Sequence, residues 1–367
     1  MDVRLVGTGG SGGWPRAGCR CASCARVRAA GRPRAPAGVT VDGVLRIDAD
    51  RGAGDTVPGA AGYRVDRLPG AWTVTGPDGG RLLVADGSGI TTQPPADARP
   101  YDIALLDLLA DPAQLGALRR RGLVHARTAV AVAHADHRVS SEEELARRCG
   151  FWDILLAQDG DVVTASPGSA TAPRVADSGP AAPAARPRRV LVLGGARSGK
   201  SRHAELRLAA EPRVTYLAAG PYPAGAQPAA DGEWAQRVAA HQSRRPWWWQ
   251  TVESVGAAQV LRRESSAILF DGAGTWLAAV MEAAGAFSGE RDAPGAIAAR
   301  VDELVEAWRQ TSARVVTVSD EVGSGIHPPT PAGRLFRDQL GWLNQRLAAE
   351  SDEAVLMVAG RPLALPA

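Results

Sequence analysis

The sequence is poor in lysine, in cysteine and in long apolar runs, and its net charge is small. All but one of its 42 basic residues are arginines, the exception being Lys200. No apolar run approaches the roughly 18 residues of a membrane-spanning helix, so we expect no membrane span. A formal net charge of +3 is too small to predict a nucleic-acid partner. Cysteines number only four, and Met1 to Thr8 does not resemble a signal peptide, so we expect a cytoplasmic protein.

Length and composition predict two domains. A chain of 367 residues is too long for one compact core. Residues 165–188 are rich in small residues and proline and show no apolar period, which is typical of a linker. We therefore expect one domain over 1–164 and a second over 189–367.

Short apolar runs dominate the first segment and predict strands with some helices between them. Residues 77–80, Pro-Asp-Gly-Gly, are a hairpin-turn signal. A helix is expected over 141–148, with Ser140 or Ser141 as its N-cap. Strands are expected at 3–6, 39–47, 81–85, 103–106, 128–133 and 154–157.

The second segment alternates short continuous apolar runs with helical stretches. This pattern predicts an α/β fold, with a parallel sheet buried on both faces and flanked by helices. Strands are expected at 190–193, 214–218, 267–270, 315–318 and 355–358, and helices from 200 and near 232–243, 294–310 and 331–350.

A phosphate-binding motif follows the first of these strands. Gly194-Gly195-Ala196-Arg197-Ser198-Gly199-Lys200-Ser201 fits the pattern G-x-x-x-x-G-K-[ST] and opens a predicted helix, which is the context that supports such a match. Glycines let backbone N–H groups surround phosphate oxygens, and the helix N-terminus adds positive charge. Lys200 supplies a compact cation and Ser201 a ligand for Mg²⁺. An accidental glycine-rich turn is a poor explanation for the position of the only lysine.

Two further residues are candidates for the chemistry. Asp271 ends a predicted strand and could hold Mg²⁺ directly or through water, or be an ordinary turn residue. His241 lies among arginines near the end of a helical stretch. A neutral imidazole can attack phosphorus while guanidinium groups hold the other phosphates. A helix-end histidine beside exposed arginines would explain the same pattern without chemistry.

Six segments of the second domain follow one another in the order found in a known family. They are LVLGGARSGKSRHAE at 191–205, TYLAAG at 215–220, RVAAHQSRRPWWWQTVE at 237–253, ILFDGAGTWL at 268–277, EVGSGIHP at 321–328 and FRDQLGWLNQRLAAESDEAVLMVAG at 336–360. Through them, residues 188–367 resemble the CobU family of bifunctional adenosylcobinamide kinase/adenosylcobinamide-phosphate guanylyltransferases, which act in cobalamin biosynthesis.

The resemblance implies a P-loop NTPase-type fold, a homo-oligomer and two reactions at connected sites. ATP or GTP would phosphorylate adenosylcobinamide, and GMP would then pass from GTP through His241 to give adenosylcobinamide-GDP. Lys200 and His241 would be catalytic, and Ser201 and Asp271 would hold Mg²⁺. The implied nucleotide contacts are Gly194, Gly195, Ala196, Arg197, Ser198, Gly199, Lys200, Ser201, Ala218, Ala219, Gly220, Gln242, Ser243, Arg244, Arg245, Glu253 and Asp271.

The sequence departs from the family pattern at several positions. Asp320 stands where Asn is usual and Gly272 where Cys is common, Ala219-Gly220 lacks the usual hydroxyl, and 221–230 is an insertion rich in Pro and Ala. Two other functions therefore stay open. One is a small-molecule kinase without guanylyl transfer, and the other is a nucleotide-binding scaffold without turnover.

The first domain resembles the metallo-β-lactamase fold of the phosphodiesterase type. The resemblance is carried by RLVGTGGSGGWP at 4–15, CRCASC at 19–24, LLVADGSG at 82–89, IALLDL at 103–108 and VAVAHADH at 130–137. It implies an αββα architecture, here truncated. Relatives bind catalytic metals through an H-x-H-x-D-H run that this sequence lacks. Asp86 and His134 remain from the later motifs, and they are too few for a two-metal centre, so we predict that this domain is not a hydrolase.

Three of the four cysteines form a cluster that predicts a separate metal site. Cys19, Cys21 and Cys24 are spaced to converge on one ion. The resemblance offers His137 as a fourth ligand, and Cys₃His is an ordinary structural zinc site. Three free thiols near a loop are the alternative.

Overall fold

The computed structural model describes residues 1–48, 61–90, 99–165, 174–176, 186–219 and 245–366. Within them the chain divides into two compact units, which we describe separately. The first unit consists of Met1–Arg186 and Ala209–Pro212, and the second of Pro187–Leu208 and Arg213–Ala367. None of the described helices is long and apolar enough to cross a membrane.

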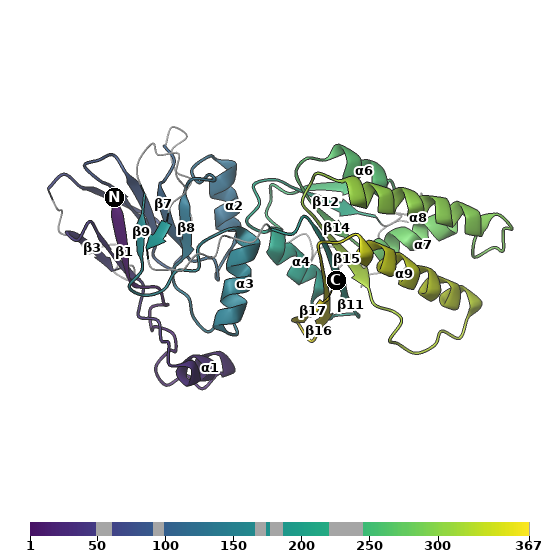
Figure 1. The fold of residues 1–367 in the computed structure, drawn as a ribbon, viewed down its shortest axis with the longest axis horizontal. Helices are drawn as coiled ribbons and strands as arrows, with labels where there is room; N and C mark the ends of the chain where they lie inside the picture. Colours follow the sequence, from purple (N-terminus) through teal and green to yellow (C-terminus); the bar gives the residue numbers. More distant parts are fainter. Residues whose placement is uncertain (49–60, 91–98, 166–173, 177–185, 220–244, 367) are drawn as a thin grey trace. The chain divides into compact units, whose positions relative to one another are not determined.

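The first unit contains two five-stranded sheets (Figure 1). One has the order β10-β9-β1-β2-β3 and is antiparallel throughout. The other has the order β4-β5-β6-β7-β8, with β4 to β6 antiparallel and β6 to β8 parallel. Its elements are β1 (Asp2–Gly7), α1 (Ala22–Ala30), β2 (Gly38–Val41), β3 (Leu45–Asp48), β4 (Arg64–Leu68), β5 (Ala71–Thr75), β6 (Arg81–Ala85), β7 (Ile103–Leu106), α2 (Ala113–Arg120), β8 (Ala129–Val132), α3 (Glu142–Trp152), β9 (Val162–Thr164) and β10 (Arg174–Ala176).

One buried core joins the two sheets of the first unit. In β1, Val3 and Leu5 are buried and alternate with exposed residues, so one face of the strand is covered. Trp72 and Ile103 of the other sheet belong to the same apolar cluster. The two sheets therefore pack as layers around shared apolar side chains.

The hairpin turn and the capped helix predicted for this unit are confirmed. Residues 77–80 connect β5 to β6, with a hydrogen bond from the Gly76 amide to the Gly80 carbonyl. Ser141 caps α3, because its hydroxyl accepts a hydrogen bond from the Glu144 amide at 3.2 Å.

Two predicted strands and the linker need correction. The run at 39–47 forms two strands rather than one, because Asp42 and Gly43 adopt positive φ angles of 48° and 72° and reverse the chain. The run at 154–157 makes only an isolated bridge to β8, since its first amide still bonds to α3. The segment 165–188 is not wholly irregular, because it contains β10, which pairs with β9.

The second unit is an α/β fold built on a seven-stranded sheet. The strand order is β13-β12-β14-β15-β11-β16-β17, and all neighbours are parallel except β16 and β17. Its elements are β11 (Arg189–Gly194), α4 (Lys200–Leu208), β12 (Val214–Ala218), β13 (Gln250–Glu253), α6 (Ala257–Arg263), β14 (Ala267–Asp271), α7 (Ala273–Ala283), α8 (Ala293–Gln310), β15 (Val315–Asp320), α9 (Pro331–Ala349), β16 (Glu353–Val358) and β17 (Arg361–Leu365). The helix expected near 232–243 lies outside the described residues.

Helices cover both faces of this sheet (Figure 1). Leu191 and Leu193 of β11 pack into a cluster with residues of α6 to α9. Val190 and Val192, which point to the opposite face, pack with Ala204 of α4 and other residues. A strand buried on both faces reads as a continuous apolar run, and this explains why the central strands could be predicted. Because helices cover both faces of the sheet, polar residues are found where its parallel strands end, at their carboxyl ends.

Candidate functional site

The phosphate-binding motif forms the loop between β11 and α4. Arg197 and Gly199 adopt positive φ angles of 56° and 96°. The Ser198 amide donates a hydrogen bond to the Gly195 carbonyl at 3.2 Å and closes the loop. Helix α4 begins directly afterwards, at Lys200. The loop thus combines a tightly turned backbone with a helix N-terminus, which is the arrangement that binds phosphate.

Close packing explains two glycines of the loop. A Cβ atom at Gly194 would collide with the Ser198 side chain, and one at Gly199 would lie 3.2 Å from Cα of Gly360. The Gly360 amide donates a hydrogen bond to the Ser198 carbonyl at 2.9 Å. Since Gly360 lies between β16 and β17, this hairpin braces the loop from a distant part of the sequence.

Lys200 lies against its own loop and against a carboxylate of β15, the strand next to β11 in the sheet. Its Nζ donates to the Gly195 carbonyl at 3.2 Å and lies 2.8 Å from Oδ1 of Asp320. Asp320 ends β15, and the parallel register pairs it with Gly194. Ser198 Oγ is buried without a hydrogen-bond partner in the described part of the chain. A phosphate oxygen would satisfy this hydroxyl, since buried polar groups are normally hydrogen-bonded.

The predicted magnesium ligands lie next to each other. Ser201 Oγ donates to Oδ1 of Asp271 at 3.3 Å, and the Tyr216 hydroxyl donates to Oδ2 at 2.8 Å. A hydroxyl and a carboxylate are the oxygen ligands that Mg²⁺ takes in phosphate sites, so the residues fit this ion. Burial, together with the Asp271 charge, raises the pKa of Tyr216 and keeps its hydroxyl protonated as a donor.

Only the end of the histidine segment is described. The Arg245 guanidinium carbon lies 3.2 Å from the ring centroid of Tyr216, a cation–π contact. Tyr216 in turn binds Asp271, which accepts a hydrogen bond from Ser201, so two side chains connect Arg245 to the phosphate loop. The other predicted contacts of this region, Gly220, His241, Gln242, Ser243 and Arg244, lie outside the described residues.

The register of the sheet brings the remaining predicted contacts to the same edge. Ala218 ends β12 and is paired with Glu253 on one side and with Asp271 on the other. Ala219 follows and is buried, whereas the Glu253 side chain is exposed. Strand ends in parallel sheets commonly carry ligand sites, and these residues are placed accordingly.

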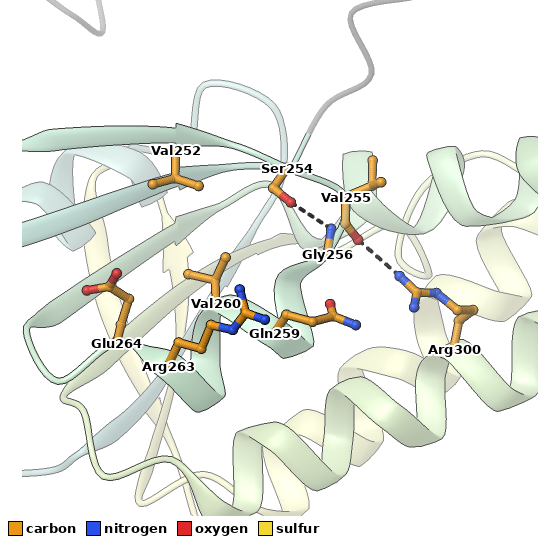
Figure 2. Close-up of a pocket in the computed structure, with 9 residues that line it drawn as sticks. All are labelled: Val252, Ser254, Val255, Gly256, Gln259, Val260, Arg263, Glu264 and Arg300. Atoms are coloured by element: carbon orange, nitrogen blue, oxygen red, sulfur yellow. Dashed lines mark hydrogen bonds between the residues drawn. The ribbon is translucent and has the colours of Figure 1, made fainter.

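A cavity of about 510 Å³ is lined by residues of β13, of α6, of α8 and of the turn between β13 and α6 (Figure 2). Val252 and Val260 line its apolar part, and Arg263 and Arg300 bring guanidinium groups to it. Its volume is within the range of small-molecule pockets. The cavity adjoins the polar edge of the sheet but contains no part of the phosphate loop.

Sequence reasoning missed the roles of two side chains. Tyr216 lies within an apolar run and could be taken for a core residue, although its hydroxyl holds Asp271. Asp320 was noticed only as a departure from the family pattern, and its strand-end position was the available signal for a contact with the loop.

The predicted cysteine cluster of the first unit is assembled. Ligand atoms of Cys19, Cys21, Cys24 and His137 all lie within 4.8 Å of one another. The His137 Nδ1 atom is 3.5 Å from the Cys19 sulfur and 3.8 Å from the Cys24 sulfur. Zinc bonds of about 2.3 Å to sulfur and 2.0 Å to nitrogen would place tetrahedral ligand atoms about 3.5 Å apart. The donor set and its spacing therefore fit zinc.

The cluster is held by α1 and its contacts. Cys21 is the N-cap of α1, and its sulfur accepts a hydrogen bond from the Cys24 amide, which lowers the pKa of Cys21. Burial raises the pKa of Cys24 to about 11. Ser23 Oγ donates to the Val139 carbonyl at 2.7 Å and accepts from the Trp14 indole at 3.1 Å. These bonds fasten the cysteine helix to the segment that carries the histidine.

Asp86 and His134 make other contacts. Asp86 forms an ion pair with Arg67, whose guanidinium also lies 4.4 Å from the centroid of the Trp72 ring. Burial opposes ionisation of Asp86, but hydrogen bonds from Ser88 and the Arg67 charge lower its pKa overall. The His134 Nε2 atom is 2.9 Å from the Ala85 carbonyl. Among the residues that the structure describes, Asp86 and His134 belong to no cluster of three or more metal-binding groups.

Comparisons with known proteins concern the second unit. A family model described as cobinamide kinase / cobinamide phosphate guanyltransferase, CobU, matches residues 190–365. The bifunctional adenosylcobalamin biosynthesis protein CobP of Pseudomonas aeruginosa is 39% identical over 183 residues, which are 48% of this chain and 96% of that protein. CobU of Salmonella typhimurium is 37% identical over 183 residues and CobU of Escherichia coli 34% over 192, each over 47% of this chain and 96% of the relative.

Proposed function

Because the chain belongs to the CobU family of cobinamide kinases and cobinamide phosphate guanyltransferases, we propose that its second unit performs both reactions on adenosylcobinamide. The first phosphorylates the substrate hydroxyl with ATP or GTP. The second uses GTP to convert the phosphate product to adenosylcobinamide-GDP. The observation that carries the proposal is the assembly of Lys200, Ser201 and Asp271 around one phosphate loop.

In the kinase reaction the substrate hydroxyl attacks the γ-phosphorus and the bond to the β-phosphate oxygen breaks. Backbone amides of the loop and Lys200 hold the phosphates in line for this displacement. Ser201 and Asp271 would hold Mg²⁺, which neutralises charge on the phosphate oxygens. Tyr216 keeps Asp271 directed toward Ser201 by binding its other oxygen.

In the transferase reaction an imidazole nitrogen of His241 attacks the α-phosphorus of GTP and pyrophosphate leaves. A phosphate oxygen of adenosylcobinamide phosphate then attacks the same phosphorus and releases the histidine. Arg245 supports this assignment, because it stacks on Tyr216 beside Asp271. His241 lies four positions before Arg245, and four extended residues reach at most about 14 Å.

A GTP adduct distinguishes this proposal from a kinase without guanylyl transfer. Incubation with GTP labelled at the α-phosphate should give an acid-labile labelled protein, and His241→Ala should give none. His203→Ala is a matched control, since that buried histidine lies on α4 and should leave labelling intact. Equal labelling of wild type and His241→Ala would refute the nucleophile. Kinase turnover without any adduct would favour the simpler kinase, and no turnover of adenosylcobinamide at all would favour the scaffold.

For the first unit we propose a metallo-β-lactamase-like fold that has lost hydrolysis and kept a structural zinc. Two packed sheets with helices support the architecture. The ion pair of Asp86 with Arg67 supports the loss of hydrolysis, because the carboxylate that a catalytic metal would need is bound to a guanidinium. Cys19, Cys21, Cys24 and His137 would hold the zinc, which would tie α1 to the sheet.

A further inference from the structure

The ion pair between Lys200 and Asp320 places a half-exposed carboxylate next to the lysine of the phosphate-binding motif. The two charged atoms are 2.8 Å apart, and the Lys200 side chain is only 16% exposed. Lys200 is also the residue whose ammonium should bind the phosphates. The Asp320 carboxylate and the phosphates of a nucleotide therefore compete for the ammonium of Lys200.

The backbone of Asp320 is fixed in this position. Its register on β15 sets it opposite Gly194, and the Glu321 amide donates to the Gly194 carbonyl at 3.2 Å. The Asp320 carbonyl accepts a hydrogen bond from Asn344 Nδ2 at 3.0 Å, and Asn344 is buried and bound to Ser319 at 2.6 Å. Movement of the strand end away from the loop would break these bonds, so the backbone of Asp320 stays beside the loop.

The carboxylates around the loop should repel the negatively charged phosphates of a nucleotide. Asp271 on the neighbouring strand adds a second carboxylate, and the ammonium of Lys200 contacts the Gly195 carbonyl of the loop. A nucleoside triphosphate without a metal brings several negative charges to this place. Like charges repel strongly at short range where protein partly excludes water. An asparagine at position 320 would offer Lys200 an oxygen without the charge.

We propose that Asp320 makes nucleotide binding dependent on a divalent cation. The carboxylate competes with the phosphates for Lys200 and repels them when no metal accompanies the nucleotide. A divalent cation on the phosphates, held by Ser201 and Asp271, offsets this repulsion and lets Lys200 serve both partners. The proposal rests on the nucleotide site proposed above and assigns Asp320 the role of a residue that selects the metal-bound form.

The test measures binding rather than turnover. The dissociation constant of α,β-methylene-GTP, which cannot transfer GMP, is measured with MgCl₂ and with EDTA for wild type and Asp320→Asn. The variant should bind the metal-free analogue about fivefold or more tightly than wild type, the factor that about 1 kcal/mol provides. Its affinity with Mg²⁺ should change less, so the ratio of the two constants should fall.

Asp302→Asn is the matched control, because it removes one negative charge at a carboxylate of α8 that pairs with Arg346. This control should keep the wild-type ratio. A wild-type ratio in Asp320→Asn, or weaker metal-free binding than wild type, would overturn the proposal while leaving the nucleotide site standing. Binding by neither protein in either condition would overturn the nucleotide site and this proposal together. Thermal unfolding of each variant verifies that it is folded.

Discussion

At the scale of single residues, the phosphate loop shows why an arginine-rich chain keeps one lysine. Lys200 folds back onto the Gly195 carbonyl and the Asp320 carboxylate, and its side chain is 16% exposed. A compact ammonium fits between these oxygens, whereas a planar guanidinium is larger and directs its donors in a fixed fork. The size and shape of the cation at position 200 therefore matter as well as its charge.

The first prediction follows from this geometry. Lys200→Arg should lower kcat for phosphorylation of adenosylcobinamide about 100-fold or more, nearly as far as Lys200→Ala, because one charged contact to the transferring group is lost. Initial rates at saturating nucleotide would measure this. Arg202→Ala removes an exposed cation from the same helix and should remain within about twofold of wild type. Substantial kinase activity in Lys200→Arg would contradict the assignment of the loop.

Tyr216 provides a second prediction at this scale. Tyr216→Phe keeps the ring under Arg245 but removes the hydrogen bond to Asp271. The half-saturating Mg²⁺ concentration for the kinase reaction should rise about tenfold, since groups that orient metal ligands have effects of this size. Tyr63→Phe removes a comparable bond to Asp42 in the first unit and should leave the Mg²⁺ dependence unchanged. An unaltered Mg²⁺ requirement in Tyr216→Phe would show that Asp271 needs no such support.

At the scale of helices and strands, continuous apolar runs decided which strands of the second unit could be predicted. The central strands of the second unit are buried on both faces and were found from their apolar runs. The strands β13 and β17 escaped notice because they form the two edges of the sheet, are largely exposed, and lack such runs. Pro362 in β17 further hides that strand, although an edge position accommodates proline.

The candidate site was predictable only as far as local motifs extend. The loop and the cysteines each lie within a few residues of sequence, so their patterns were readable. The contacts of Tyr216 with Asp271 and of Lys200 with Asp320 depend on which strands are neighbours and in what register. Such pairing joins residues that are distant in sequence, and a single sequence does not reveal it.

Helix α4 gives a prediction about stability. Arg207, whose side chain is 1% exposed, forms a two-bond ion pair with Glu353 of β16 and so fixes the helix behind the loop. Glu353→Ala should lower the free energy of unfolding by about 2–4 kcal/mol, because it removes the carboxylate that compensates a buried charge. Glu350→Ala breaks an exposed pair with Arg309 and should cost less than about 1 kcal/mol. Chemical denaturation measures both, and equal losses would contradict the argument.

At the scale of the whole molecule, the two units differ in the chemistry that they can support. The second unit carries the phosphate loop and the strand-end carboxylates and matches its relatives over nearly their full length. The first unit offers a thiol and imidazole cluster with the spacing of a tetrahedral metal site. We therefore expect the nucleotide site and the metal cluster to be separable by experiment.

The last prediction tests this separation by metal content. The purified protein should contain one zinc ion per chain, measured by atomic emission, and Cys24→Ser should contain none. Asp86→Asn should retain one zinc ion, because that carboxylate is engaged by Arg67. A strong zinc chelator should lower the melting temperature, since a structural metal contributes folding energy. Two or three ions per chain would show that the first unit keeps a catalytic centre.

The brace between the phosphate loop and the last hairpin has a consequence for synthesis of the protein. Ser198 accepts its hydrogen bond from Gly360, 162 positions later in the chain. A ribosome therefore translates the loop long before it delivers the amide that supports it. Until then the loop lacks this hydrogen bond, so we expect a chain that ends before Gly360 to bind nucleotide more weakly than the full chain. The phosphate loop therefore reaches its final, braced structure only after the hairpin of β16 and β17 has formed.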